Sequence, residues 1–238
     1  MLISFQGFSS RILIPMDDSQ SNHLKAYGVT FWVLGNGVEA QWLLNYRGGS
    51  FMLPNINSIA EECVIRGVSF NIIADVQADQ ILNEISDSEV NMESVKLEKS
   101  PKIAVYSPAG KLPWDDAVTL VLTYAEIPYE IVYDEEVLSG VLPKYDWLHL
   151  HHEDFTGQFG KFYKAFRTAT WYQDEVDSQN ASANFMGFQK VSEMKREVSL
   201  TIRNFVLGGG FLFTMCSGTD SFDIALAAQK VDICDSMF

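Results

Sequence analysis

The stretch Gly208-Gly-Gly-Phe-Leu-Phe-Thr-Met-Cys-Ser-Gly-Thr-Asp-Ser221 decides the fold predicted for this chain. The glycines at its start predict the end of a helix. The apolar run Phe211–Met215 then predicts a buried strand, and Gly218 predicts a sharp turn into a further helix. A strand that turns sharply into a helix is typical of α/β sheets, in which ligands bind beyond the carboxyl ends of parallel strands. Functional groups are therefore expected where strands end.

The same alternation of strands and helices is predicted along the whole chain. Residues 86–101 are polar and punctuated by a proline, which predicts a linker between an N-terminal α/β half, 11–90, and a second half, 102–238. The pattern predicts a three-layer α/β sandwich with a mostly parallel sheet. The predicted strands are Arg11–Met16, Ala40–Asn45, Val68–Ala74, Lys102–Tyr106, Glu130–Tyr133, Tyr145–His151 and Phe211–Met215. The loops expected to meet at their carboxyl ends are Asp17–Gln20, Ser107–Pro113, His151–Gly157 and Cys216–Asp220.

Composition excludes several classes of protein. The 238 residues carry 31 acidic and 17 basic side chains, a net charge of −14, and no basic stripe, which argues against nucleic-acid binding. No apolar run reaches the ~18 residues that span a bilayer. The three cysteines, Cys63, Cys216 and Cys234, form neither a disulfide framework nor a zinc motif. A small-molecule substrate is therefore expected, without a cofactor, and the oligomeric state stays open.

Both ends of the chain are unusual. Residues 1–10, MLISFQGFSS, are apolar and end in small residues, like the remnant of a secretory signal peptide. Export to the periplasm or medium is then expected; with an ordinary packed or disordered N-terminus, the location would be cytoplasmic. Residues 231–238 finish on apolar side chains without a polar tail, which predicts a second half truncated at its C-terminus.

Cys216 is the first candidate for chemistry. It follows a predicted buried strand and precedes a helix, whose N-terminal N–H groups stabilise a thiolate and bind an oxyanion. The alternative is a small buried residue that fills a tight turn.

The second candidate is the run His149-Leu-His-His-Glu-Asp154, which contains three of the four histidines of the chain. His149 and His151 share one face of a predicted strand. A metal pair and a structural cluster both fit this pattern, and no metal site is assigned. A functional role for His151, His152, Glu153 and Asp154 is the hypothesis retained.

Two further sets of residues are candidates for substrate binding. Asp17 and Asp18 end the first predicted strand near His23, where they could line a cleft or simply cap the next helix. Ser217, Gly218, Thr219 and Asp220 lie at a helix start, in the setting of a phosphate-binding loop of the SGGxDS kind, but without its second glycine.

The strand, Cys216, Gly218 and helix resemble the nucleophile elbow of class I glutamine-amidotransferase-like domains, although Thr214 stands where their elbow usually has glycine. That resemblance implies a flavodoxin-like fold and a Cys-His-Glu triad. Nearly the whole chain is similar to a bacterial family often labelled asparagine synthetase B. The similar segments are ILIPMDDSQSNHLKAYG (12–28), WDDAVTLVLTYAEIPY (114–129), YDWLHLHHEDFTGQFGKF (145–162) and GGGFLFTMCSGTDSFDIALAA (208–228).

These resemblances lead to a functional hypothesis. Cys216 would be the nucleophile of an amide hydrolase or amide-nitrogen transferase, with His151 or His152 as base and Glu153 or Asp154 as its orienting carboxylate. The alternative is a domain that binds without catalysis. It would be similar to the trehalose-utilisation relatives of the superfamily, which are thought to handle carbohydrate.

Overall fold

The structure is a computed structural model that describes residues 10–108, 117–159 and 162–235. The chain divides into two compact units, one formed by residues up to 100 with 121–127, the other by 101–120 with 128–238. The predicted signal-peptide remnant, apart from Ser10, lies outside the described residues, and so do most of the Ser107–Pro113 loop and the last three residues.

The first unit is built on a five-stranded sheet in which every neighbouring pair is antiparallel. The strand order is β4-β1-β3-β2-β5. The strands are β1 (Ser10–Ile14), β2 (Ala40–Leu44), β3 (Ser50–Pro54), β4 (Asn71–Ala74) and β5 (Glu93–Leu97).

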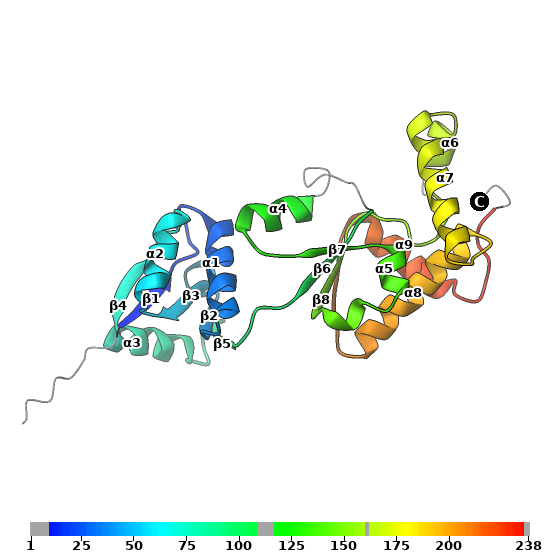
Figure 1. Cartoon of the computed structure of the whole chain (residues 1–238). Coiled ribbons are helices and arrows are strands. Elements are labelled where there is room, and N and C mark those ends of the chain that lie inside the picture. Colours follow the sequence, from blue (N-terminus) through cyan, green and yellow to red (C-terminus); the bar gives the residue numbers. More distant parts are fainter. Residues whose placement is uncertain (1–9, 109–116, 160–161, 236–238) are drawn as a thin grey trace, which may run out of the picture. The chain divides into compact units, whose positions relative to one another are not determined.

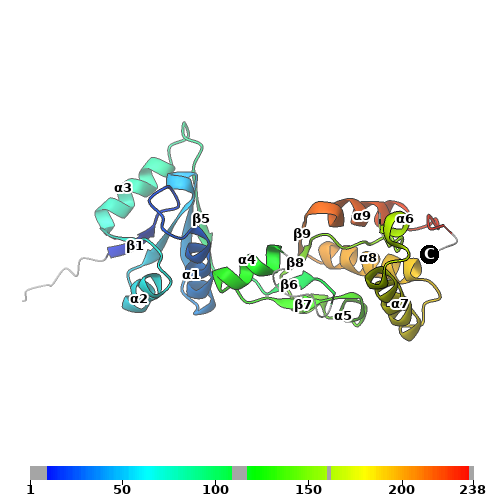
Figure 2. The same ribbon diagram turned by 90° about the horizontal axis from the view of Figure 1, so that it is seen from above.

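Helices cover both faces of this sheet (Figure 1; Figure 2). Helices α1 (His23–Gly35) and α2 (Asn57–Ile65) pack on the face that carries Ile12 and Ile14. Helix α3 (Asp75–Ile85) packs on the opposite face, against Leu13. Because successive strand side chains point to opposite faces, the apolar run of β1 serves both layers.

The predicted mostly parallel, flavodoxin-like sandwich is wrong, since the larger sheet is antiparallel. Only residues 45–49 join β2 to β3, and the turn η1 (Tyr46–Gly48) lies within them. Asn45, Arg47, Gly48 and Gly49 all have positive φ there, between 46° and 94°. So short a connection reverses the chain, because a parallel pair needs a crossover of about a dozen residues.

Two strands of the first unit were not predicted. Strand β3 (Ser50–Pro54) matches none of the predicted strands and begins directly after the 45–49 turn. Strand β5 lies within the predicted linker, and its polar pattern, ESVKL, is that of an edge strand with a neighbour on one side only.

The second unit contains a four-stranded sheet in which all strands are parallel, in the order β7-β6-β8-β9. The strands are β6 (Ile103–Tyr106), β7 (Glu130–Val132), β8 (Trp147–Leu150) and β9 (Phe211–Thr214). The expectation that Lys102–Tyr106, Tyr145–His151 and Phe211–Met215 form neighbouring parallel strands is confirmed.

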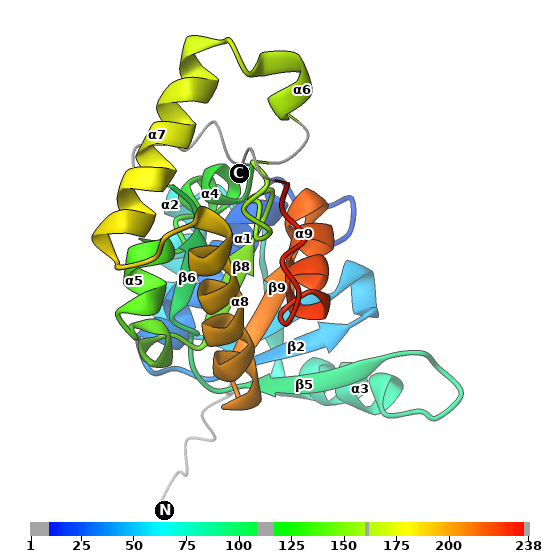
Figure 3. The same ribbon diagram turned by 90° about the vertical axis from the view of Figure 1, so that its right-hand side faces the viewer.

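Three helices lie side by side on one face of this sheet (Figure 3). They are α5 (Asp134–Leu138), α8 (Val191–Leu207) and α9 (Cys216–Ala227). The short turn η3 (Leu142–Lys144) leads into β8, and α6 (Tyr163–Phe166) and α7 (Thr170–Phe185) precede α8. On the opposite face, Phe211 and Phe213 of β9 are exposed.

Helix α4 (Ala117–Ala125) ends in the segment that belongs to the first unit, and that segment packs closely on α1. A Cβ built at Gly28 would lie 1.8 Å from the carbonyl oxygen of Ala125. Beside this contact, Glu126 forms ion pairs with Lys25 at 2.5 Å and Arg66 at 3.2 Å. Gly28 therefore permits a backbone approach that a side chain would block.

We predict that Gly28→Ala lowers the free energy of unfolding of the first unit by about 1–3 kcal/mol, the usual effect of overpacking. The measurement is urea-induced unfolding followed by circular dichroism. Gly35→Ala on the same helix is the matched control, because the nearest atom to its Cβ is Ser100 Oγ at 3.7 Å. The control should be neutral or stabilising by about 0.5–1 kcal/mol. Equal effects of the two substitutions would contradict the close approach at Gly28.

Candidate functional site

The carboxyl ends of the four parallel strands lie at one edge of the second sheet. Tyr106 ends β6, Asp134 lies two residues beyond β7, and His151 and Cys216 follow β8 and β9 closely. The chain passes from β6 to β7 on one side and then to β8 on the other, so its direction across the sheet reverses between β6 and β8. Ligands of parallel sheets bind at this edge, near such a reversal.

Cys216 occupies a strained turn between β9 and α9. Met215 is extended, with φ −135° and ψ 162°, and Cys216 then takes a φ of +50°. A side chain in this left-handed region costs about 1–2 kcal/mol, and such residues cluster at active sites. The Cys216 side chain is exposed, at the start of a 12-residue helix.

Gly218 holds this turn against the end of β8. Its N–H donates to the carbonyl oxygen of His151 over 2.8 Å. A Cβ at Gly218 would lie 2.3 Å from the same oxygen, so a larger residue would push the turn away. Because this N–H is engaged, the N–H of Ser217 is the better candidate for binding an oxyanion beside Cys216.

Three more hydrogen bonds join this region to the end of β8 and the residues that follow it. Met215 N–H donates to Leu150 O over 2.9 Å. The Ser217 hydroxyl donates to His152 O over 3.1 Å, and the Ser221 hydroxyl donates to Glu153 O over 2.8 Å. The structure therefore brings the Cys216 turn and the Leu150–Glu153 segment together through hydrogen bonds to main-chain carbonyl oxygens.

The side chains after β8 form a row of contacts. The Nδ1 atoms of His151 and His152 lie 3.0 Å apart. His152 Nε2 lies 3.7 Å from Oε1 of Glu153, which is buried. Glu153 therefore contacts an imidazole that in turn contacts His151.

The remaining candidates in this unit have other contacts. The Asp154 carboxylate accepts from Thr156 N–H at 2.9 Å and from its hydroxyl at 2.6 Å, which closes a local turn. Thr219 Oγ1 lies 3.1 Å from Thr214 Oγ1, and Asp220 is exposed. Among the described residues, no three His, Cys, Asp or Glu side chains are grouped so that they could hold a metal ion.

Asp17 and Asp18 belong to the first unit. Arg47 donates to Asp17 from Nε over 2.6 Å and from Nη2 over 3.3 Å, and the Ser19 hydroxyl donates to it over 2.5 Å. These hydrogen bonds hold the pKa of Asp17 well below its usual range. Asp18 is exposed. The Asp17 carboxylate is therefore engaged by Arg47 and Ser19, and these contacts hold the loop after β1 in place.

A buried charged cluster at the carboxyl edge was missed by sequence reasoning. Lys195 of α8 is only 1 % exposed, and its Nζ lies 2.8 Å from Asp134 Oδ2. Lys195 also donates to the hydroxyls of Tyr106 over 3.0 Å and Tyr133 over 3.3 Å, and the Tyr106 hydroxyl donates to Asp134. Lys195 lies among apolar positions of α8, and a lysine on an apolar helix face was the available signal.

Burial has opposing effects on the pKa values in this cluster. It raises the pKa of Tyr106 well above its usual value, with Asp134 adding to the effect, and it raises that of Tyr133 to about 12. Burial disfavours charged Lys195, but Tyr133 and Asp134 outweigh it and raise the pKa of Lys195. The charged lysine therefore contributes stability at neutral pH, which is lost only as pH rises through this raised pKa.

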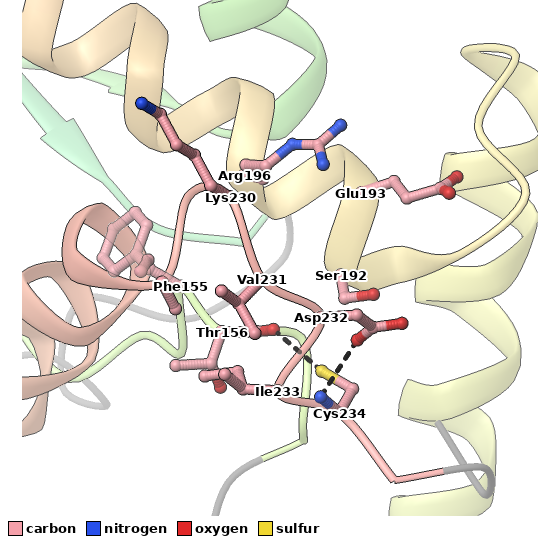
Figure 4. Close-up of a pocket in the computed structure, with 12 residues that line it drawn as sticks. Phe155, Thr156, Ser192, Glu193, Arg196, Lys230, Val231, Asp232, Ile233 and Cys234 are labelled. Carbon is pink, nitrogen blue, oxygen red and sulfur yellow. Dashed lines mark hydrogen bonds between the residues drawn. The ribbon is translucent and has the colours of Figure 1, made fainter.

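A cavity of ≈ 160 Å³ lies between the start of α8, the end of α9 and residues 230–234 (Figure 4). Cys234 donates from Sγ to Thr156 O over 3.3 Å, and Asp232 pairs with Lys190 at 2.9 Å. These contacts fasten the 230–234 segment to the loop that follows Asp154, through Thr156, and to the start of α8, through Lys190. Cys216 is not among the residues that line this cavity.

Comparison of the chain with known protein families, curated proteins and solved structures found no significant match. None of the helices in the described part of the chain is long and apolar enough to cross a membrane. Because no known protein matches, we infer a functional site at Cys216 from the geometry of the site.

We predict that iodoacetamide modifies Cys216 first, Cys234 more slowly and Cys63 only on unfolding. Cys216 is exposed, whereas Cys63 is buried. Burial raises the pKa of Cys63 to about 11 and also raises that of Cys234, so both stay largely protonated near pH 7. Peptide mapping by mass spectrometry after timed labelling measures the order. Labelling of Cys63 as fast as Cys216 would contradict the described burial.

We also predict that Lys195→Met lowers the free energy of unfolding by about 3–5 kcal/mol, because it leaves the Asp134 carboxylate buried without a counter-charge. Chemical unfolding of the purified chain measures the loss. The double substitution Lys195→Met with Asp134→Leu removes both charges and should recover most of it. A single substitution that changes stability by less than about 1 kcal/mol would show that the pair is solvated.

Proposed function

We propose that the second unit is a cysteine-dependent amide or acyl hydrolase or transferase of the glutamine-amidotransferase-like kind, with Cys216 as its nucleophile. The observation that carries the proposal is the strained turn that exposes Cys216 at the carboxyl edge of a parallel sheet, hydrogen-bonded to the histidine segment after β8. A nucleophile, imidazoles and a buried carboxylate then lie just beyond two neighbouring strands. Covalent catalysis uses these three kinds of group together.

The contacts support specific roles for the residues after β8. Glu153 contacts His152, and His152 contacts His151, so Glu153 would orient the imidazole pair and stabilise its positive charge. The His151 ring lies 4.7 Å from that of His152 and 6.3 Å from that of His149, and its carbonyl oxygen is bonded to the Cys216 turn. We therefore assign His151 as the base that takes the thiol proton, and His152 as its positioning residue. Asp154 is not required, since its carboxylate serves the Thr156 turn.

The reaction balances without a cofactor. The Cys216 thiolate adds to the amide carbonyl carbon, and the oxyanion that forms accepts a hydrogen bond from the Ser217 N–H. The carbon–nitrogen bond breaks, and the leaving nitrogen takes the proton held by the imidazole, so that ammonia departs. Water then adds to the thioester, the carbon–sulfur bond breaks, and a carboxylic acid and the free thiol result.

The test is covalent trapping on the 238-residue chain. We expect p-nitrophenyl acetate and the glutamine analogue 6-diazo-5-oxo-L-norleucine to modify Cys216, as observed by intact and peptide mass spectrometry. The adduct should be absent in Cys216→Ser and unchanged in the matched control Cys234→Ser. Glu153→Gln and His151→Ala should slow the modification by about tenfold or more, because each removes part of the acid–base system.

Release of ammonia from L-glutamine measures turnover with the substrate that the resemblance implies. Cys216→Ser should lower kcat/KM at least a thousandfold, the scale seen when a nucleophile is removed. If neither probe modifies Cys216, or if the histidine and glutamate substitutions leave its modification rate unchanged, the nucleophile assignment fails. A domain that binds without catalysis is then the better description.

A further inference from the structure

A second cavity of this unit, of ≈ 340 Å³, lies between Phe159, α6 and α7. It is separate from the Cys216 site, with which it shares no lining residue. Its lining combines aromatic rings with a small number of planar polar groups, as small-ligand sites commonly do. The lining residues are Phe159, Tyr163, Arg167, Tyr172, Gln173, Val176 and Asp177.

Two aromatic rings meet at a right angle in this lining. The ring centroids of Phe159 and Tyr172 are 6.4 Å apart, and the ring planes are inclined by 77°. Phe159 reaches this position with a φ of +52°, a conformation that an L-residue adopts only when its surroundings hold it there. The π-face of an aromatic ring attracts a cation.

The lining holds one charge of each sign, Arg167 and Asp177. Arg167 Nη1 donates to Lys164 O over 3.0 Å, which leaves other N–H groups of its guanidinium for a ligand. In the part of the chain that the structure describes, the Asp177 carboxylate forms no ion pair or hydrogen bond. A ligand with only a positive charge would be repelled by Arg167, and one with only a negative charge would be repelled by Asp177.

Tyr172 contributes an unused polar group. Its hydroxyl is buried and has no hydrogen-bond partner among the described residues. Burial raises the pKa of Tyr172, and Tyr163 and Glu175 raise it further, so the hydroxyl keeps its proton at neutral pH. A buried donor without a partner is costly, and this cost is consistent with a site that binds a ligand.

We propose that this cavity binds a small zwitterion whose ammonium and carboxylate groups are a few bonds apart. The ammonium group lies against the ring faces and Asp177. The carboxylate accepts hydrogen bonds from Arg167 and from the Gln173 amide, whose other N–H donates to Arg167 O over 3.2 Å. Opposite charges in the ligand match opposite charges in the lining, which neither a simple cation nor a simple anion does. The proposal is independent of the chemistry assigned to Cys216.

The test is titration of the 238-residue chain with glycine betaine and with L-valine, followed by calorimetry and saturation-transfer NMR. The two probes distinguish a methylated from a primary ammonium group, and saturable binding of either supports the proposal. Choline lacks the carboxylate, and 3,3-dimethylbutanoate replaces the betaine nitrogen by carbon, so both should bind more weakly by about threefold or more. Failure of both zwitterions to bind, or equal binding of 3,3-dimethylbutanoate, overturns the proposal.

Substitutions of the exposed charged residues in the lining test whether the ligand binds in this cavity. Asp177→Asn and Arg167→Gln should each raise the Kd of the zwitterion that binds by about threefold or more, the scale of a partly exposed charge contact. Asp174→Asn on the same helix and Lys164→Gln are matched controls that remove the same charges outside the lining. Equal weakening by the controls would show a general field effect and overturn the site. Circular dichroism confirms that each variant is folded.

Discussion

The second unit is organised around one buried interaction, the ion pair between Lys195 of α8 and Asp134 at the start of α5. Two charges out of water are stable only if their remaining hydrogen bonds are satisfied, and here the hydroxyls of Tyr106 and Tyr133 contribute to that. The pair thereby connects the end of β6, the turn after β7 and helix α8. An apolar cluster of the same size would also stabilise the fold, but without the directional hydrogen bonds that join these three elements.

Packing contacts connect this charged cluster to the turn that carries Cys216. The Tyr106 ring lies 4.9 Å from that of Phe155, and Phe155 packs at 5.5 Å on Phe222 of α9. Phe155 is two residues beyond Glu153, and α9 begins at Cys216. The charged cluster, the aromatic contacts and the main-chain bonds of Gly218 thus form one continuous support. Cys216 can keep its strained φ because its neighbours on both sides are held.

Some of the architecture was predictable from local pattern. The apolar runs at 103–106, 147–150 and 211–214, each followed by polar residues, marked parallel strands and the edge where their ends meet. The antiparallel sheet of the first unit was not predictable in the same way. Its strands and helices alternate with similar spacing, and the direction of β3 depends on left-handed residues in the 45–49 turn. Strand β5 was hidden because an edge strand has little apolar pattern.

The sequence by itself determined which residue types stand after each strand of the second unit, and therefore that Cys216 and the His151–Asp154 run are neighbours at one edge. Hydrophobic periodicity and turn residues are local properties of the sequence. In a parallel sheet the residues that follow the strands also lie at the same edge, so the local pattern indicates which of them are neighbours. Only the tertiary structure decided which of those groups contact one another. It showed that Glu153 lies beside His152, whereas the Asp154 carboxylate accepts hydrogen bonds from Thr156 and closes a local turn. It also revealed Lys195, because the partner of a buried charge comes from segments 61 and 89 residues away in the chain and leaves no local pattern.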